Sequence, residues 1–213
     1  MNTFVKLALI AAVALPLQFS SAQVVINEIY AGGGNAGSPF NQDFIEIFNN
    51  GLPGSTAIDI GGYTIEYKPA TMAGTFSLLA TIPAGTFLAP GQFYVIAVGP
   101  VGATGSAVPA NLIGATTNLA TTNGAVRLLN ASLGIVDLVG YGSATNNVFE
   151  GTAPAPTMSN TTSIQRTAGI DTNMNNLDFT AMAPTPIPEP GTYMLLGIGA
   201  LLCVQRFRRS RSN

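Results

Sequence analysis

Short runs in which apolar and polar residues alternate cover the middle of the chain, from Val24 to about Arg166. An alternation with a period of two residues, rich in aromatic and β-branched side chains, is typical of a half-buried β-strand. Clusters of Gly and Pro separate the runs, and no helical periodicity interrupts them, so the pattern favours a β-sandwich or barrel. The predicted strands are Val24–Tyr30, Asp43–Phe48, Tyr63–Lys68, Gln92–Val98, Ala125–Leu129, Gly134–Val139 and Ser163–Arg166.

The alternation also predicts which side chains share a face of the sheet. Tyr63, Ile65 and Tyr67 are expected to point inward, and Gln92–Val98, apolar on both faces, is expected to be a central strand. In the first strand, Ile26 and Glu28 fall on one face and Ile29 on the other. Asn130–Leu133 is predicted to be a hairpin loop, Ser163–Arg166 the last strand, and the Pro-containing stretch Glu150–Thr162 a long surface loop.

The C-terminal end has a different composition from the body. Pro188-Glu189-Pro190 precedes an apolar run, Tyr193–Val204, and the basic residues Arg206, Arg208, Arg209 and Arg211 follow it. Proline lacks a backbone donor and fixes φ, so the first segment cannot continue a helix or strand. The apolar run is shorter than the roughly 20 residues of a full membrane span, and the arginines favour the cytoplasmic side. One interpretation is a permanent membrane anchor.

The other interpretation is a sorting signal that is cut. The order of Pro188-Glu189-Pro190, the apolar run and the arginine cluster resembles the PEP-CTERM signal of Gram-negative, biofilm-forming bacteria. This resemblance implies recognition by an exosortase, a membrane protease similar to a transpeptidase, with cleavage close to the Pro-Glu-Pro. The basic cluster is then explained by membrane topology.

The N-terminal end is consistent with export. Lys6 is followed by the apolar stretch Leu7–Leu17 and by the small residues Ser20-Ser21-Ala22, with a cleavage site expected between Ala22 and Gln23. This order is that of a secretory signal peptide, which implies the Sec machinery as a partner. We therefore expect an exported protein that crosses the inner membrane once, transiently, and then resides at the cell surface or outside the cell.

Five segments follow from these signals. They are a signal peptide (1–22), a β-domain (23–180), a Pro-rich linker with the PEP motif (181–190), a short transmembrane helix (191–205) and a basic cytoplasmic tail (206–213).

The body resembles the lamin tail domain. The segments that carry the resemblance are Val25–Ile29, Asp43–Asn49, Ile58–Ile65, Leu88–Ile96, Val136–Gly142, Ser163–Arg166 and Asp171–Phe179. The resemblance implies an all-β fold, an immunoglobulin-like antiparallel β-sandwich, and a role in binding or tethering without a reaction. One departure is that Asn50-Gly51 follows Asn49 where the family has Asn-Pro, so this turn must differ.

The composition excludes several classes of function. The body has three basic residues against nine acidic ones, a net charge of −6, which argues against nucleic acid as a partner. The chain contains no histidine, which removes Ser-His-Asp and Cys-His nucleophiles and the commonest zinc ligand. The one cysteine, Cys203, lies in the tail, so the body has neither a thiol nor a disulfide.

Carboxylates could still carry chemistry. Glu28 and Glu46 lie on neighbouring predicted strands and could form an acid–base pair, although strand carboxylates more commonly face solvent or fix a turn. The glycines of Gly32-Gly33-Gly34 lack the Gly-Lys-Ser/Thr ending of a phosphate-binding loop, so an ordinary flexible loop is expected.

An oxygen-rich segment lies near the end of the body. Asp171, Asn173, Asn175 and Asp178 could present oxygen ligands to Ca²⁺. The segment is not an EF-hand, since Asn176 replaces the glycine; the alternative is a turn whose side chains bond the local backbone. Arg166 is expected to pair with an acid of this region, and no other cofactor is expected.

The sequence therefore favours an exported, non-enzymatic β-sandwich sorted by exosortase, with a structural, adhesive or binding role. Extracellular polysaccharide or a surface protein is a possible partner, but Trp is absent and Tyr30, Tyr63 and Tyr67 are expected in the core. Two alternatives remain open. One is a carboxylate-dependent extracellular hydrolase, and the other is a permanently membrane-anchored periplasmic binding protein.

Overall fold

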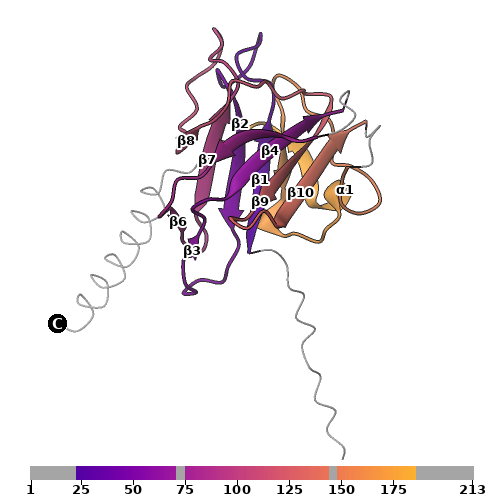
Figure 1. Cartoon of the computed structure of the whole chain (residues 1–213). Helices are drawn as coiled ribbons and strands as arrows, with labels where there is room; N and C mark the ends of the chain where they lie inside the picture. Colours follow the sequence, from indigo (N-terminus) through magenta and orange to yellow (C-terminus); the bar gives the residue numbers. More distant parts are fainter. Residues whose placement is uncertain (1–22, 71–74, 144–147, 186–213) are drawn as a thin grey trace, which may run out of the picture.

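The computed structural model describes residues 23–70, 75–143 and 148–185. Figure 1 shows that these residues form strands arranged in layers, with one short helix at the edge. The strands are β1 (Val24–Tyr30), β2 (Asp43–Asn49), β3 (Ile58–Asp59), β4 (Thr64–Pro69), β5 (Ser77–Thr81), β6 (Phe87–Leu88), β7 (Phe93–Val98), β8 (Leu112–Ile113), β9 (Asn123–Leu129), β10 (Ile135–Gly142), β11 (Ser163–Arg166) and β12 (Phe179–Met182). A 3₁₀ turn, η1 (Thr167–Gly169), and a single helical turn, α1 (Asn175–Asp178), lie between β11 and β12.

The strands form two main sheets that pack face to face. The first sheet has the order β12-β11-β1-β2-β7-β8 and the second the order β10-β9-β4-β5, while β3 and β6 form a small separate pair. All paired strands in the two sheets are antiparallel except β7 and β8, which are parallel. The predicted all-β, immunoglobulin-like sandwich is therefore confirmed, with one parallel pair at an edge.

The core lies between the two sheets. The first sheet contributes Ile47 from β2 and Ile96 from β7, and the second sheet contributes Ile65, Val126 and Val139. All five side chains belong to one buried cluster. A smaller cluster on the other face of the first sheet consists of Tyr30, Phe44 and Val95, with Phe40 packed against it. Both faces of the first sheet are therefore partly covered, and its central strands carry buried apolar side chains on both sides.

A β-bulge in β1 changes the predicted faces of that strand. The pairing of β1 with β2 shifts between Ile26 and Glu28, so one residue is inserted into the alternation. Ile26 and Ile29 consequently face the same core, although strict alternation placed them on opposite faces. The prediction for the first strand was wrong here because a bulge leaves no mark in the hydrophobic pattern.

Other predicted elements are confirmed. Ile65 and Tyr67 lie in the core with Tyr63 packed against them. The β7 strand lies between β2 and β8, as expected of a central strand. The hairpin of β9 and β10 turns at Asn130, whose side-chain oxygen accepts hydrogen bonds from the backbone of Ser132 and Gly134.

The end of the domain differs from the prediction. The β11 strand is not the last, since β12 pairs with it through a register that joins Ser163 to Met182. The fold therefore extends beyond the predicted domain boundary at residue 180. The first residues of the predicted linker belong to β12, which pairs with β11. The stretch after Glu150 is also more than a surface loop: Ala155 and Met158 are buried in the core.

The termini predicted to act in export lie outside the described residues. These are the signal peptide, the sorting tripeptide, the transmembrane segment and the basic tail. Within the described part of the chain, the helices are too short to cross a bilayer.

The glycines after β1 are required by close packing of the backbone. A Cβ atom on Gly33 would lie 1.9 Å from the backbone carbon of Gln42, whereas one on Gly37 would meet nothing within 4 Å. Gly33 is thus fixed by a close approach of two backbone segments, and Gly37 only by its positive φ of 80°.

We therefore expect Gly33→Ala to destabilise the domain by about 3 kcal/mol, because the backbone of Gln42 must move. Gly37→Ala is the control and should cost only about 1–2 kcal/mol, the strain of a left-handed alanine. Urea unfolding followed by circular dichroism measures both. Equal losses in the two variants would contradict the packing argument.

Candidate functional site around Arg166

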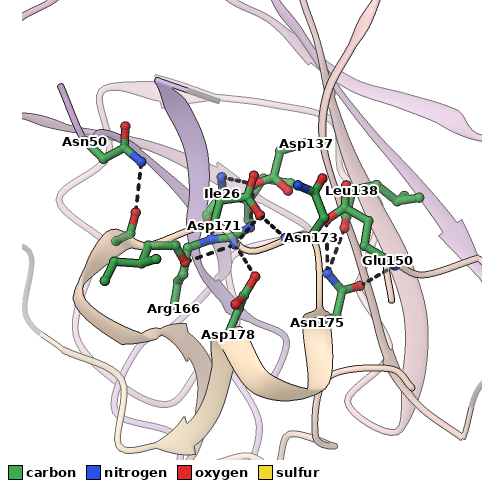
Figure 2. A network of polar contacts seen from close by, with 12 residues as sticks. Ile26, Asn50, Asp137, Leu138, Glu150, Arg166, Asp171, Asn173, Asn175 and Asp178 are labelled. Carbon is green, nitrogen blue, oxygen red and sulfur yellow. Dashed lines mark hydrogen bonds and ion pairs between the residues drawn. The ribbon is translucent and has the colours of Figure 1, made fainter. Parts of the chain in front are cut away.

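A buried arginine at the end of β11 organises the polar interior of the protein. The Arg166 side chain is 0% exposed, and its guanidinium forms ion pairs with three carboxylates. The distances are 2.7 Å from Nη2 to Asp137 Oδ2, 3.0 Å from Nη1 to Asp171 Oδ1 and 3.1 Å from Nη1 to Asp178 Oδ2. Figure 2 shows the arginine reaching these acids from one side of the network.

The remaining contacts of Arg166 tie it to the first sheet. Its Nε donates to the backbone oxygen of Ile26 in β1 at 2.9 Å, and Nη1 also donates to that of Ile170 at 3.4 Å. The guanidinium carbon lies 4.6 Å from the centre of the Phe179 ring. One side chain thus joins β1, β10, β12 and the segment between β11 and β12.

The backbone supplies further donors to the three acids. Asp137 Oδ2 accepts from the Ile26 amide at 2.6 Å, and Asp171 Oδ1 accepts from the Asn173 amide at 3.0 Å. Asp178 accepts from the amide of Thr172 at 2.9 Å and from its hydroxyl at 2.5 Å. Asp137 Oδ1, in contrast, is buried and has no hydrogen-bond partner.

Asn175, at the start of α1, connects this network to a fourth acid. Its Oδ1 accepts from the amides of Gly140 at 2.8 Å and Glu150 at 3.1 Å. Its Nδ2 donates to the backbone oxygen of Leu138 at 3.0 Å and to Glu150 Oε2 at 3.4 Å. Asn175 therefore holds the segment that carries Glu150 against β10.

Burial and like charges raise the pKa of two of these acids. Burial raises the pKa of Asp137 to about 6, although Arg166 and the Ile26 amide oppose the shift. Burial, together with the neighbouring carboxylates of Asp137 and Asp171, raises the pKa of Glu150 to about 7. Three carboxylates share the guanidinium and Glu150 lies beside them, so acids outnumber bases at this site.

The four predicted calcium ligands have different hydrogen-bond and ion-pair partners in the structure. Asp171 and Asp178 both contact Arg166, as the sequence led us to expect of an acid in this region. Asn173 contributes its backbone amide to Asp171, and Asn175 points toward Gly140 and Glu150. Several of these oxygens therefore bond local backbone, which is the Asx-turn alternative.

Asp137 and Glu150 were not among the predicted site residues. Carboxylate oxygens of Asp137, Glu150 and Asp171 lie within 4.8 Å of one another, although the three residues are far apart in sequence. No local spacing could have found them, because they meet only through the placement of β10 beside β1 and through Asn175.

Comparison with known families identifies the fold and the tail. A family model, the Lamin Tail Domain, matches residues 18–143, more than half of the chain. The chain belongs to the lamin tail domain family. A second model, the PEP-CTERM protein-sorting motif, matches residues 186–210. No curated protein matches the chain.

The PEP-CTERM motif implies export and sorting by an exosortase to the surface or the outside of the cell. Of the predicted signal residues, Arg211 falls one position beyond the match, and the others fall within it. The lamin tail match ends at Ser143, so Arg166 and three of its four neighbouring acids lie beyond it. The strands β11 and β12, at one edge of the first sheet, are therefore outside the matched segment.

The two candidate catalytic acids of the lamin tail domain are neighbours, as predicted. Glu28 and Glu46 face each other in the pairing of β1 with β2. They are buried, with exposures of 0% and 3%, so the expectation that they face solvent was wrong. Glu28 accepts from the Thr185 hydroxyl at 2.7 Å and Glu46 from Asn27 Nδ2 at 2.8 Å. A polymer substrate cannot reach a pair that is buried in this way.

The glycine-rich loop of the lamin tail domain serves an acid of the protein itself. The Gly33 amide donates to Asp43 Oδ1 at 2.8 Å, and the Leu119 amide donates to Asp43 Oδ2 at 2.9 Å. A carboxylate already occupies the donor that a phosphate would need. The backbone of Gly33 also lies so close to that of Gln42 that there is no room for a Cβ atom.

Replacing Arg166 by Met should destabilise the lamin tail domain by about 3–5 kcal/mol, because three buried carboxylates lose their cation. Arg127→Met is the matched control. Arg127 pairs with Glu66 at a partly exposed site, so its loss should cost less than about 1 kcal/mol. Urea unfolding of both variants measures the difference, and similar losses would show that Arg166 does not organise the interior.

The pH dependence of stability should follow the buried acids. Burial raises the pKa of Glu46 from 4.5 to about 7 in the folded state. Between these two values the folded state binds more protons than the unfolded state, so stability should fall as pH rises. The shift corresponds to about 3 kcal/mol lost between pH 4.5 and 7.5.

Urea midpoints measured across this range test the expectation. Glu46→Gln should reduce the slope, because an amide does not titrate, while Asp59→Asn, at an exposed position, should leave it unchanged. A stability that rises steadily with pH in the wild-type protein would be evidence against the buried state of Glu46.

Proposed function

We propose that the mature protein is a non-enzymatic structural or adhesive module of the cell surface or extracellular matrix. Its partner there is extracellular polysaccharide or another surface protein. The observation that carries the proposal is that the sorting motif begins at residue 186, shortly after the last strand of the sandwich, β12, ends at Met182. The folded domain is thus the part of this chain that the motif delivers.

The residues that follow β12, up to Thr185, are hydrogen-bonded to the first sheet. The Thr185 hydroxyl donates to Glu28 Oε2 at 2.7 Å, and Gln165 Nε2 donates to the backbone oxygen of Ala183 at 2.7 Å. These contacts hold the chain against β1 and β11 immediately before the motif. A C-terminal segment that is hydrogen-bonded to the sheet suits a domain that is sorted through a signal attached to that segment.

The chemistry of the interior supports a non-enzymatic role. The carboxylates with raised pKa values serve other groups of the fold, as Asp43 serves the amides of Gly33 and Leu119. A surface pocket is lined by apolar and uncharged polar residues, without an acid or a base. Its lining consists of Tyr67, Pro69, Ser77, Thr117, Asn118, Leu119 and Ala120. A carboxylate-dependent hydrolase would need two accessible acids in such a place.

In a Gram-negative host with an active exosortase, we expect the mature protein to lack its arginine-rich end and to leave the inner membrane. Pro188→Ala combined with Glu189→Ala should keep the intact tail and remain in the membrane fraction, because the signature tripeptide is lost. Pro53→Ala, at an exposed position of the body outside the matched motif, is the control and should be processed normally. Intact-mass spectrometry of fractionated cells measures all three.

The same strains test the role of the delivered domain. Cells that lack the protein should adhere less to a surface, and wild-type protein should restore adhesion while the double variant should not. Glu46→Gln should restore it fully, since no catalytic carboxylate is involved. An intact arginine tail on the wild-type protein would contradict sorting, and an adhesion defect in Glu46→Gln would favour the hydrolase.

A further inference from the structure

Three carboxylates converge next to Arg166 from separate parts of the chain. Asp137 belongs to β10, Glu150 to the segment after it, and Asp171 to the segment before α1. One carboxylate oxygen of each lies within 4.8 Å of the other two. Figure 2 shows the three side chains entering the same polar network. Acids in proximity do not by themselves make a metal site, so a second observation is needed.

That observation is the free oxygen of Asp137. The residue is 1% exposed, and its Oδ2 already accepts from the Ile26 amide and from Arg166. Its Oδ1 is buried without a hydrogen-bond partner, although the side chain belongs to the acidic cluster. A buried carboxylate oxygen that has lost its water is costly unless a donor or a cation replaces it.

The charges of the site also favour a cation. When Asp137, Glu150, Asp171 and Asp178 are all ionised, they carry four negative charges against the one positive charge of Arg166, an excess of three. Arg166 pairs with only one oxygen of each aspartate, Oδ2 of Asp137 and Oδ1 of Asp171. Glu150 makes no direct ion pair with Arg166 among the described residues, so the arginine offsets its charge only from a distance.

We infer that Asp137, Glu150 and Asp171 bind a Ca²⁺ ion. All three offer oxygen, the donor that Ca²⁺ prefers. Ca²⁺ takes about six to eight oxygen ligands in a flexible geometry, whereas Mg²⁺ demands a near-ideal octahedron at about 2.1 Å and usually keeps several waters. Glu150 is only half-buried, so water can reach the ion and complete its shell. Of the four ligands predicted from sequence, this set retains Asp171 and replaces the others.

Such an ion would connect segments that otherwise depend on Arg166 and Asn175. It would join β10, within the matched family segment, to two segments beyond it. Calcium sites in extracellular modules commonly have dissociation constants of about 0.1–1 mM. A site of this strength fills outside the cell and stays empty at cytoplasmic calcium levels, so the ion would complete the fold after export.

Isothermal titration of the full chain in detergent, with CaCl₂ and separately with MgCl₂, tests the site. We expect one Ca²⁺ per chain with a dissociation constant between about 0.1 and 1 mM, and a higher melting temperature in Ca²⁺ than in EGTA. Mg²⁺ should bind at least about tenfold more weakly. Glu150→Gln should weaken Ca²⁺ binding more than about tenfold, since it removes a charged ligand from a half-exposed position that Arg166 does not use.

Asp59→Asn is the matched control, because it also removes one negative charge while an amide oxygen can keep the hydrogen bond from the Gly61 amide. It should bind Ca²⁺ like the wild-type protein. Absence of heat and of a melting shift would overturn the proposal. Equal affinities of wild type and Glu150→Gln would also overturn it, and Mg²⁺ binding as tight as Ca²⁺ binding would overturn the choice of metal.

Discussion

The shared contact of Arg166 and Ile26 with Asp137 is the interaction on which the two sheets depend. Asp137 lies on β10 of the second sheet, and its Oδ2 accepts from the Ile26 amide in β1 and from Arg166 in β11. Arg166 returns a hydrogen bond to the Ile26 oxygen. Hydrophobic side chains hold the layers together without direction, whereas this polar contact fixes one strand against the others.

The protein accommodates its buried acids mainly with backbone donors, since its body has few bases. Asp43 receives two amides, and Asp178 receives the amide and hydroxyl of Thr172. Burial outweighs the two amides at Asp43, so its pKa rises to about 6. The domain therefore holds acids that keep their proton to a higher pH than usual, which is the reverse of the usual salt-bridged surface acid.

The sequence predicted what depends on local pattern, and it missed what depends on register. Alternation located β4, β7 and the β9–β10 hairpin, but the bulge between Ile26 and Glu28 inverted half of β1. In the site, Arg166 and Asp171 could be associated because they are close in the chain. Asp137 and Glu150 could not, because their approach is set by β10 lying beside β1 and by the amide of Asn175.

One strand, β1, links the polar interior to the end of the domain that precedes the sorting motif. Ile26 in β1 contacts Arg166, and Glu28, two residues later, holds Thr185 next to the sorting motif. The bulge between them allows Ile26 to face the core while Glu28 pairs with Glu46 and reaches toward Thr185. A pull on the C-terminal end would therefore load β12, β11 and then β1, which lies inside the first sheet between β11 and β2. Load carried into a central strand is shared by neighbours on both sides.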